Sequence, residues 1–336
     1  MILVTGGTGL VGSHLLLQLV QDNDKIRAIR RSASSLHHVR YVFSLYNRDA
    51  EKLFENIEWV EADMEDKESL HNAFAGISFV YHCAAAVSFD PMKKYAMIRN
   101  NVEGTANLVN ACLENEIEKL CYVSSTSSLG SAPEGELITE DMIWNASRYR
   151  TSYSISKFKS EMEVWRGITE GLNAVIVNPS IIIGPGDWER SSSRLFSVVW
   201  KGMKYYSEGV TGYVDIRDVI TAMIRLMETD VSGERFTVSS ENLSYRQVLD
   251  MISERLGKNP PARCAGSFLS SIAWRFDWLN HFITGKKRRI SREAVHAIRQ
   301  KSYFSNEKIK KTTGLEFKAI SDSIAETARL FLNYQQ

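Results

Sequence analysis

Short apolar runs alternate with amphipathic stretches along the first 180 residues of the chain. Runs rich in β-branched or other apolar residues predict six strands: Ile2–Thr5, Ile26–Arg30, Ile57–Glu61, Phe79–His82, Leu120–Ser124 and Ala174–Asn178. The stretches between them predict helices, among them Gly9–Val20, Met97–Asn115 and Ser152–Thr169. Strands separated by helices form a parallel sheet, because right-handed crossovers place a covering helix on one face or the other. The predicted fold class is therefore α/β, with a doubly wound parallel sheet.

The pattern changes after Gly184-Pro185-Gly186. Residues 190–210 and 262–300 favour helix or irregular structure and are rich in Ser, Trp and Phe, and Arg235–Ser239 is the one clear strand that remains. Tyr213–Glu228 is expected to return to the first domain. We therefore expect two units: a nucleotide-binding domain of residues 1–186 plus about 213–240, and a smaller, mostly helical C-terminal substrate lobe of residues 187–212 and 241–336.

Glycines at positions 6, 9 and 12 lie between the first strand and the first helix. Gly6 permits a tight turn, Gly9 lets the backbone approach a pyrophosphate, and Gly12 lets the helix pack closely on the strand. The start of the helix adds free N–H groups and the positive end of its dipole. This position favours dinucleotide binding over a glycine-rich turn without a ligand. The expected contacts come from one segment, namely Gly6, Thr8, Gly9, Leu10, Val11 and Gly12.

The end of the second strand bears on which dinucleotide binds. The strand ends in Arg30-Arg31-Ser32, and no acidic residue follows the glycines where an NAD-binding carboxylate is expected. Two guanidinium groups would bind the 2′-phosphate of NADP, although they could also be ordinary surface arginines. NADP is therefore the expected cofactor, with NAD as the alternative. Asp63, at the end of the third strand, is placed to meet the adenine.

Tyr153 and Lys157 share one face of the helix expected at 152–169. A Tyr and a Lys at this spacing are common by chance, so their meaning comes from the glycine-rich opening and from the serine-rich segment Tyr122–Gly130. With these pieces together, the chain resembles the extended short-chain dehydrogenase/reductase family, which includes the NAD-dependent epimerases and dehydratases. Within that family it is most similar to the dihydroflavonol-reductase and 3β-hydroxysteroid-dehydrogenase-like branch.

The resemblance covers nearly the whole chain and implies a Rossmann fold. Its motifs are the Thr5–Gly12 opening, Asp63, His82-Cys83-Ala84-Ala85, Asn101, Ser125, Tyr153–Lys157, Asn178–Gly186, Tyr213–Val219 and Asn306–Leu315. By the same resemblance, further cofactor contacts would come from Met64, Cys83, Ala84, Ala85, Tyr153, Lys157, Pro179 and Ser180.

The resemblance also implies catalytic roles for Ser125, Tyr153, Lys157 and Asn101. Tyr153 would be the acid/base, and acting as a base near neutral pH needs a drop of roughly 3 units in its pKa, about 4 kcal/mol. Lys157 would stabilise the phenolate and hold the nicotinamide ribose, and an oxidised nicotinamide would add positive charge. Ser125 would hydrogen-bond the substrate oxygen and is preferred over Ser124 by its distance from Gly130, with Thr126 as a possible second donor. Asn101 would support a water-linked proton path.

Composition and charge exclude other classes of protein. The 41 basic and 40 acidic residues leave a net charge of +1, which argues against a nucleic-acid partner. No run approaches the roughly 20 apolar residues of a membrane span, and the opening Met1-Ile-Leu-Val leaves no room for a signal peptide. The four cysteines (Cys83, Cys112, Cys121 and Cys264) form no CxxC pair and are expected to be buried and reduced. A cytoplasmic location is therefore expected.

Two further signals are given little weight. The histidines are dispersed, His37-His38 is interpreted as a solvated loop pair, and no metal is expected. The aromatic segment 268–282, with Trp274, Phe276 and Trp278, precedes Lys286–Arg289 and could anchor the chain on a membrane surface. We favour a helix that covers an apolar substrate pocket, because charged residues interrupt the apolar face.

Three functional hypotheses remain. The first is an NADP-dependent reductase or dehydrogenase of a bulky small-molecule carbonyl or hydroxyl compound, for which Phe196, Val199, Trp200 and Tyr205 suggest an apolar pocket. The second is a nucleotide-sugar epimerase or dehydratase that recycles its cofactor, with Arg190, Arg194 and Arg217 as candidate diphosphate ligands. The third is a dinucleotide-binding sensor without catalysis. By analogy, a homodimer through helices 97–115 and 152–169 is expected.

Overall fold

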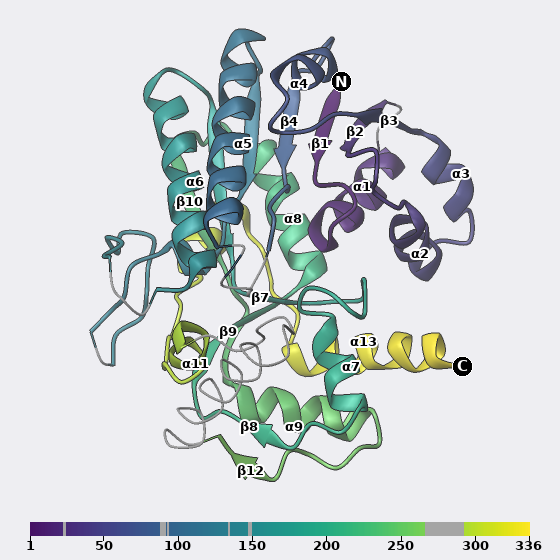
Figure 1. Cartoon of the computed structure of the whole chain (residues 1–336), viewed down its shortest axis with the longest axis vertical. Coiled ribbons are helices and arrows are strands. Elements are labelled where there is room, and N and C mark those ends of the chain that lie inside the picture. The colour runs from purple at the N-terminus through teal and green to yellow at the C-terminus, as the bar shows by residue number, and fades with distance from the viewer. Residues whose placement is uncertain (23–24, 88–91, 93, 134, 147–149, 266–291) are drawn as a thin grey trace.

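A seven-stranded parallel sheet forms the centre of the first part of the chain (Figure 1). The computed structural model describes residues 1–22, 25–87, 92, 94–133, 135–146, 150–265 and 292–336. In spatial order the strands are β10 (Glu234–Val238), β6 (Ala174–Pro179), β5 (Lys119–Val123), β4 (Phe79–His82), β1 (Ile2–Thr5), β2 (Ile26–Arg30) and β3 (Ile57–Glu61). This order confirms the predicted doubly wound α/β class, and the chain reverses its direction of progress between β1 and β4.

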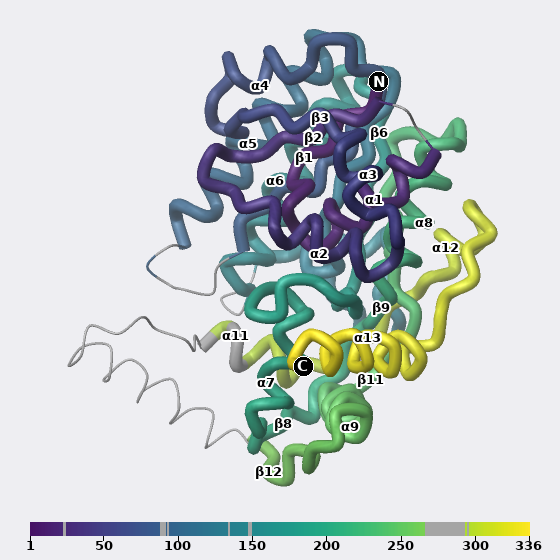
Figure 2. The backbone as a smooth tube through the Cα atoms, turned by 90° about the vertical axis from the view of Figure 1, so that its right-hand side faces the viewer, coloured from purple at the N-terminus to yellow at the C-terminus, as the bar shows by residue number. Residues whose placement is uncertain are grey.

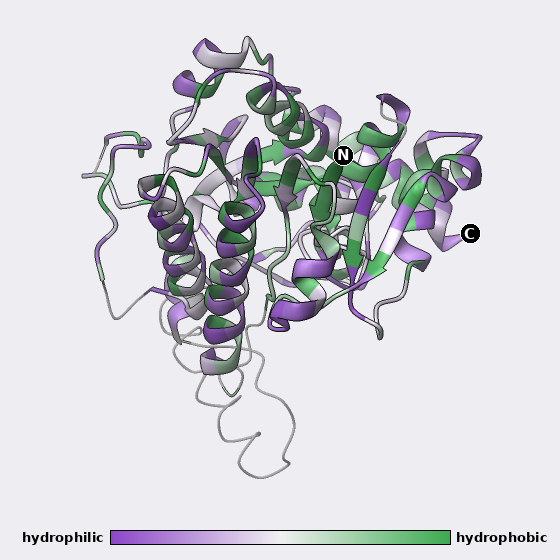
Figure 3. Ribbon diagram, turned by 90° about the horizontal axis from the view of Figure 1, so that it is seen from above, coloured by the Kyte–Doolittle hydropathy of each residue, from purple (hydrophilic) through white to green (hydrophobic). Residues whose placement is uncertain are grey.

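Helices cover both faces of this sheet, and alternation along the strands explains why. On β1, Leu3 belongs to one buried apolar cluster and Val4 to the other, because successive side chains point to opposite faces. The face of Val4 carries α1 (Leu10–Asp22), α2 (His37–Tyr46), α3 (Ala50–Glu55) and α8 (Ile216–Met227). The face of Leu3 carries α4 (Lys67–Ala73), α5 (Lys94–Glu114) and α6 (Ser152–Thr169). In Figure 3 apolar colour is concentrated on the central strands, and polar colour marks the outer faces of the helices.

The strand and helix predictions for this part hold closely. The first four strands have the predicted bounds, Leu120–Ser124 lies one residue earlier as β5, and Ala174–Asn178 extends to Pro179 as β6. The predicted helix Ser152–Thr169 is α6, and Arg235–Ser239 is β10, one residue earlier. His37 and His38 differ from the prediction, because they begin α2 and are not in a loop.

The second part contains more strand than the sequence pattern suggested. A three-stranded sheet joins β7 (Ile181–Ile183), β9 (Val210–Asp215) and β11 (Glu241–Ser244), and a two-stranded sheet joins β8 (Tyr205–Tyr206) and β12 (Arg263–Cys264). β7, β8 and β12 have only two or three residues, and glycine or polar residues interrupt β9 and β11, so these strands give no clear pattern. Around them lie η2 (Thr126–Ser128), α7 (Arg194–Trp200), α9 (Tyr245–Arg255), α11 (Arg292–Ala297), α12 (Glu307–Thr313) and α13 (Ile320–Gln335).

The helices of the second part share a core of their own. Phe196 and Val199 of α7 are 0% and 2% exposed and pack with Trp188 and with Phe331 of α13. Figure 2 shows α13 lying across this part, above α9. Phe196 and Val199 therefore do not line an apolar pocket, which corrects that expectation, and Tyr205 is exposed. Phe196 and Val199 are apolar because they pack in the core that they share with α13.

The division into two units stays a prediction. Residues 213–240 contribute α8 and β10 to the large sheet as expected, but α12, placed in the smaller lobe by the sequence, packs against β10 and α8. The aromatic segment 268–282 and the basic run Lys286–Arg289 lie outside the described residues. No helix in the described part of the chain is long and apolar enough to cross a membrane.

The cysteines are free thiols, and three of the four fit the expectation of burial. Cys112 and Cys121 are buried and Cys83 is half-buried. Cys264 is exposed, because it ends the two-residue strand β12 at the margin of the second part. This corrects the expectation for Cys264.

Candidate active site

The glycine-rich turn meets the loop after β4 at the point where the strand order reverses. β1 and β4 are neighbours, with Thr5 opposite His82. Gly6 has φ +68°, and a Cβ atom there would lie 2.5 Å from the backbone nitrogen of Ala84. Only glycine therefore fits between the two loops. This brings the predicted cofactor residues Gly6, Cys83 and Ala84 together at the switch point, where ligands bind in doubly wound sheets.

Hydrogen bonds within the turn set the direction of α1. The Gly9 N–H donates to the Gly6 carbonyl at 2.9 Å, and the Ser13 N–H donates to the Gly9 carbonyl at 2.9 Å. A Cβ atom on Gly12 would lie 2.2 Å from the Gly6 oxygen, so the helix packs directly against the turn. Leu10 and Val11 begin the helix, and their N–H groups have no carbonyl of the preceding turn to bond. They are available to an anion beside the half-buried Thr8.

His82 is buried and holds the ends of β1 and β4 in place. In the sequence it stood out only as part of a motif. His82 Nδ1 lies 2.6 Å from Thr5 Oγ1, and His82 Nε2 lies 3.2 Å from Thr105 Oγ1 of α5. Burial lowers the pKa of His82 to about 3, so the ring is neutral near pH 7. His82 therefore connects β1, β4 and α5 below the switch point.

An acidic residue of β3 lies beside the end of β2. Arg30 pairs in register with Glu61 of β3, and Arg30 Nη2 lies 2.6 Å from Glu61 Oε1. The expectation that this corner holds no acid is therefore wrong, because the neighbouring strand supplies one. Arg31 is exposed and has no ion pair among the described residues, and Arg30 Nε is buried without a hydrogen-bond partner. Positive charge and one free donor thus remain at the corner.

Asp63 and Met64 follow β3 and lie close to α5. Asp63 Oδ1 accepts from the Glu65 N–H at 3.1 Å, which makes a local turn. The Met64 side chain packs at Gly104 of α5, where a Cβ atom would lie 2.9 Å from the Met64 Cβ. Asn107 Nδ2 donates to the Met64 carbonyl at 2.9 Å. Both residues are half-buried at the carboxyl edge of the sheet, and their contact with adenine stays a prediction.

Ser125 and Tyr153 come together from two different elements. Thr151 caps α6 by accepting the Ser154 N–H at 3.0 Å, and Ser154 Oγ donates to the Ser127 carbonyl at 2.6 Å. This joins the first turn of α6 to η2, which follows Ser125. This places Tyr153 close to Ser125. Burial raises the pKa of Tyr153, and the nearby Ser125 hydroxyl opposes that rise.

Lys157 lies one turn further along α6 and is 3% exposed. Its Nζ donates to the Val123 carbonyl at the end of β5 at 2.8 Å and lies 5.1 Å from the centre of the Tyr122 ring. Burial lowers the pKa of Lys157 to about 8. Lys157 therefore occupies a position near both Tyr153 and the loop of Cys83, and its free-amine form is within reach near neutral pH.

Asn101 joins α5 to the site by hydrogen bonds to protein groups. Its Oδ1 accepts the Ala86 N–H at 2.7 Å, and its Nδ2 donates to the Ala86 carbonyl at 2.9 Å and to Ser156 Oγ of α6 at 2.8 Å. Both amide hydrogens are therefore used within the chain. Asn101 holds the backbone just beyond Ala84 and Ala85 against α6, and its part in a proton path stays a prediction.

The end of β6 completes the carboxyl edge of the sheet. Pro179 and Ser180 are buried, and the Ser180 N–H donates to the Val238 carbonyl at 3.1 Å. Asn178 Nδ2 donates to the Ser125 carbonyl at 3.2 Å, so β6 and the Ser125 loop are in contact. Cofactor contacts by Pro179 and Ser180 remain expectations.

The sequence analysis missed Glu161, which is fully buried on α6. It accepts hydrogen bonds from Ser124 and Ser128 on either side of Ser125, at 2.5 and 2.6 Å. The Ser124 hydroxyl is therefore directed into this buried network, whereas the Ser125 hydroxyl oxygen accepts the Ser127 N–H at 3.2 Å. The signal available in the sequence was the spacing of four residues from Lys157, which places an acid on the same helix face.

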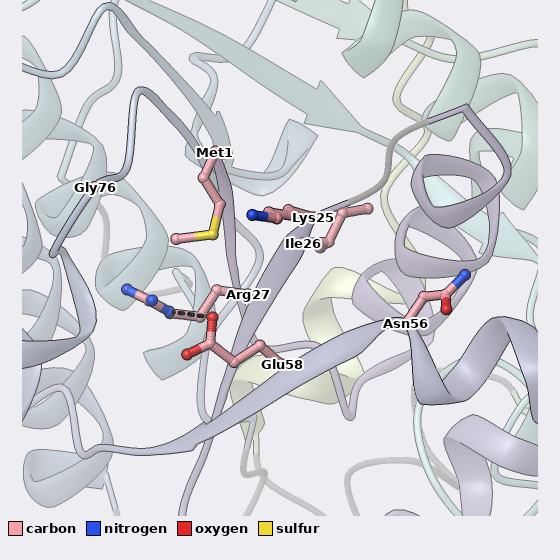
Figure 4. Close-up of a pocket in the computed structure, with 7 residues that line it drawn as sticks. All are labelled: Met1, Lys25, Ile26, Arg27, Asn56, Glu58 and Gly76. Carbon is pink, nitrogen blue, oxygen red and sulfur yellow. Dashed lines mark hydrogen bonds and ion pairs between the residues drawn. The ribbon is translucent and has the colours of Figure 1, made fainter.

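One hollow in the structure lies away from this site. About 530 Å³ in volume, it is lined by Met1, Lys25 and Gly76 together with the Arg27–Glu58 ion pair (Figure 4). Met1, Lys25 and Gly76 precede β1, β2 and β4, so the hollow lies at the amino ends of the strands. The switch point is at the carboxyl ends, and this hollow is no part of the candidate active site.

Arg217, one of the three candidate diphosphate ligands, is already engaged. Its guanidinium contacts the Asp215 carboxylate at 2.7 Å and the Glu326 carboxylate at 2.9 Å. Arg194 is exposed, and Arg190, 84% exposed, lies 3.5 Å from Asp187. Two arginines of that set, Arg190 and Arg194, are therefore exposed to solvent.

Comparison with known proteins gives matches over the whole length of the chain. A family model described as the NAD dependent epimerase/dehydratase family matches residues 2–239. A putative dihydroflavonol 4-reductase of Synechocystis sp. is 26% identical over 340 residues, covering 98% of this chain and 94% of the relative. Cinnamoyl-CoA reductase 1 of Petunia hybrida is 25% identical over 338 residues, covering 97% and 90%.

A solved structure shows the same fold. The UDP-glucose 4-epimerase of Thermotoga maritima, solved with UDP-glucose, superposes with a TM-score of 0.77. The match covers 100% of this chain and 99% of that chain at 19% identity. At this identity the likeness shows a shared fold alone.

Proposed function

The chain belongs to the NAD dependent epimerase/dehydratase family, and we propose that it is an NADP-dependent reductase of a bulky carbonyl compound, or a dehydrogenase of the corresponding alcohol. Membership makes it an NAD(P)-dependent enzyme of the oxidoreductase type. The observation that carries the proposal is that the Ser154–Ser127 hydrogen bond joins the first turn of α6, which carries Tyr153, to the segment of Ser125. Lys157 lies one turn further along α6, and the glycine turn lies two strands away at the end of β1.

The chemistry requires one proton at the substrate oxygen. When bound, NADPH supplies the hydride. Ser125 Oγ would donate a hydrogen bond to the carbonyl oxygen, and Tyr153 Oη would give that oxygen its proton. Because the pKa of Tyr153 is raised, the phenol is protonated at neutral pH. A protonated phenol can donate the proton that reduction of a carbonyl group requires.

The arginine corner supports NADP, with one competing charge. Arg31 and the unpartnered Nε of Arg30 would hold the 2′-phosphate, and the N–H groups at the start of α1 would hold the pyrophosphate. Glu61 reduces the positive potential at this corner because it neutralises part of Arg30. The preference for NADP is therefore expected to be moderate and to depend on Arg31.

Aromatic and apolar side chains around α6 support a bulky substrate. Trp144 stacks on Phe158, the residue after Lys157, with ring centres 4.1 Å apart, and Arg150 lies over Trp144. Ile143 is 88% exposed and Val87, beyond the Ala86 held by Asn101, is 58% exposed. The reductase names of the two relatives point to substrates of the same class.

The second candidate function is that of a nucleotide-sugar epimerase or dehydratase. The two accessible arginines, Arg190 and Arg194, support it as diphosphate ligands, together with the fold shared with a UDP-glucose 4-epimerase. The ion pairs of Arg217 with Asp215 and Glu326 weaken it, because a diphosphate would have to displace two carboxylates.

One experiment separates the two functions. The purified protein is supplied with NADPH and a panel of aromatic, steroid-like and aliphatic ketones, and separately with UDP- and dTDP-sugars without added cofactor. Loss of NADPH absorbance in proportion to ketone reduced is expected. Conversion of a sugar nucleotide with no net change at 340 nm would instead show the recycling function.

A further inference from the structure

Glu161 connects the segment that carries Ser125 to the strand that follows it in the sheet. Its Oε2 accepts three hydrogen bonds, from Ser124 Oγ at 2.5 Å, Ser128 Oγ at 2.6 Å and Asn178 Nδ2 at 2.9 Å. Ser124 and Ser128 lie on either side of Ser125, and Asn178 Nδ2 also reaches the Ser125 carbonyl. One carboxylate oxygen therefore holds β5, η2 and β6 together directly beneath the Ser125 hydroxyl.

The other carboxylate oxygen of Glu161 is paired with a cation from the edge of the sheet. Arg235 Nη1 of β10 lies 2.9 Å from Glu161 Oε1, and the Arg235 side chain is 14% exposed. Arg235 Nε and Nη2 donate to the Glu140 carbonyl, and Nη2 also donates to the Met142 carbonyl. Burying an ion pair contributes little or nothing to stability on average. Its position behind the site therefore indicates a role other than stability.

Glu161 also sets the electrostatic surroundings of Lys157. The groups facing Lys157 from β4 and β5 are neutral near pH 7: burial raises the pKa of Cys83 to about 12, lowers that of His82 to about 3 and raises that of Tyr122. On α6 itself, the Glu161 carboxylate raises the pKa of Lys157 against the lowering by burial. Among the described residues that act on Lys157, Glu161 thus supplies the negative charge.

We propose that Glu161 is a positioning residue of the active site, which fixes the Ser125 segment through Ser124 and Ser128 and supplies the negative charge opposite the Lys157 ammonium. The roles of Ser125 and Lys157 in this statement rest on the proposed function. Arg235 completes the arrangement, since it holds the carboxylate in place from β10. Glu161 itself touches neither substrate nor cofactor.

Three variants of the full-length protein test separately the charge of Glu161, the length of its side chain and the effect of removing a different carboxylate from α6. Glu161→Gln alone would leave Arg235 buried without its partner, which is strongly destabilising, so Arg235→Met is added to it. Glu161→Asp keeps the charge but shortens the side chain, so contacts with Ser124 and Ser128 are lost. Glu163→Gln is the matched control, because it removes a carboxylate from the outer face of α6, where Glu163 pairs with Arg166.

The first readout needs no substrate. Lysine labelled with ¹³C at Cε is titrated by NMR, and the Lys157 signal is assigned by its loss in Lys157→Arg. A midpoint near 8 is expected in the wild type, in Glu163→Gln and in Glu161→Asp, and a lower midpoint in Glu161→Gln/Arg235→Met. An unchanged midpoint in the double variant would overturn the electrostatic role, whether or not the protein reduces ketones.

The second readout is turnover of a ketone with NADPH. In Glu161→Asp, kcat should fall roughly 10- to 100-fold, the range expected for losing hydrogen bonds to a charged group, with little change in KM and an unchanged pH profile. In the double variant the pH profile should shift downward together with the Lys157 midpoint. Should kcat of Glu161→Asp equal that of Glu163→Gln, the positioning role is wrong. Absence of ketone turnover in the wild type would count against the proposed function and leave the lysine titration valid.

Discussion

At the scale of single residues, the site is made by side chains whose ionisation is shifted by burial. Tyr153 has a raised pKa and Lys157 a pKa lowered to about 8, so near pH 7 the phenol is protonated and most Lys157 side chains still carry the ammonium charge. Both shifts arise because burial disfavours the charged form of either group. The chain by itself therefore prepares a proton donor rather than a phenolate.

Replacing Tyr153 by Phe is expected to abolish turnover with little effect on the fold. Only the hydroxyl is deleted, so the ring still packs, but the proposed proton donor is lost. Activity should fall at least a hundredfold, as measured by NADPH oxidation, while cofactor affinity changes little. Lys157→Ala should differ by weakening cofactor binding as well. Retention of more than a tenth of the wild-type rate in Tyr153→Phe would show that another group is the acid.

Cofactor preference should respond in opposite directions to one substitution after β2 and one at the end of β3. Arg31→Ala removes an unpaired guanidinium, and a charge-assisted hydrogen bond contributes roughly 1.5–3 kcal/mol, so NADPH affinity should fall at least tenfold. Glu61→Gln removes the carboxylate 2.6 Å from Arg30 and should strengthen NADPH binding. Neither substitution should change NADH affinity as much. Fluorescence titration with both nucleotides measures this, and equal effects on NADPH and NADH would contradict the 2′-phosphate assignment.

At the scale of elements, the turn between β1 and α1 depends on two glycines for different reasons. At Gly12 a Cβ atom would lie 2.2 Å from the Gly6 oxygen, so α1 could not keep its place against the turn. At Gly9, which is exposed, the nearest atom to such a Cβ would be 3.3 Å away. Packing within the chain thus excludes a side chain at Gly12. At Gly9 the proposed approach of the cofactor pyrophosphate would exclude one.

Alanine at these two positions should separate folding from cofactor binding. Gly12→Ala is expected to destabilise the protein by several kcal/mol, because two backbone segments must move apart. Gly9→Ala should keep most of the stability but weaken NADPH binding, because the added methyl group faces the pyrophosphate. Thermal unfolding and fluorescence titration measure the two effects. Equal stability of the two variants would contradict the packing argument.

At the scale of the whole molecule, buried neutral histidines make stability depend on pH. Burial lowers the pKa of His14 to about 4 and that of His82 to about 3, against about 6.5 in an unfolded chain. Between these values the unfolded state binds protons that the folded state does not, so stability is complete above pH 6.5 and falls as the pH falls. Asp218 acts in the opposite direction, because burial raises its pKa to about 6.

We expect His82→Gln to lose less stability than the wild type between pH 7 and pH 5. Glutamine can still bond Thr5 and Thr105 but does not titrate, and each histidine accounts for roughly 2 kcal/mol at pH 5. Urea unfolding at the two pH values gives the comparison, and the opposing effect of Asp218 cancels between the two proteins. Equal losses would show that His82 is not responsible.

A homodimer through α5 and α6 stays a prediction of the sequence.

The sequence by itself determined the elements and the motifs that follow them. The bounds of α6, the first four strands and the Tyr153–Lys157 spacing could all be predicted, because periodicity and helix geometry depend on neighbours a few residues away. The order of the motifs along the chain also indicated the family, and the family model confirms it.

Only the tertiary structure decided which residues meet across elements. Glu61 lies beside Arg30 because of the register between β2 and β3, and Glu161 meets Arg235 across 74 residues of chain. Asn101 reaches Ala86 and Ser156 because α5 and α6 pack together. Such contacts depend on strand register and helix packing, which act between segments that are distant in the sequence. For that reason the proposed catalytic residues Ser125, Tyr153 and Lys157 could be named from their motifs, whereas the Glu161 carboxylate behind them and Glu61 beside Arg30 could not.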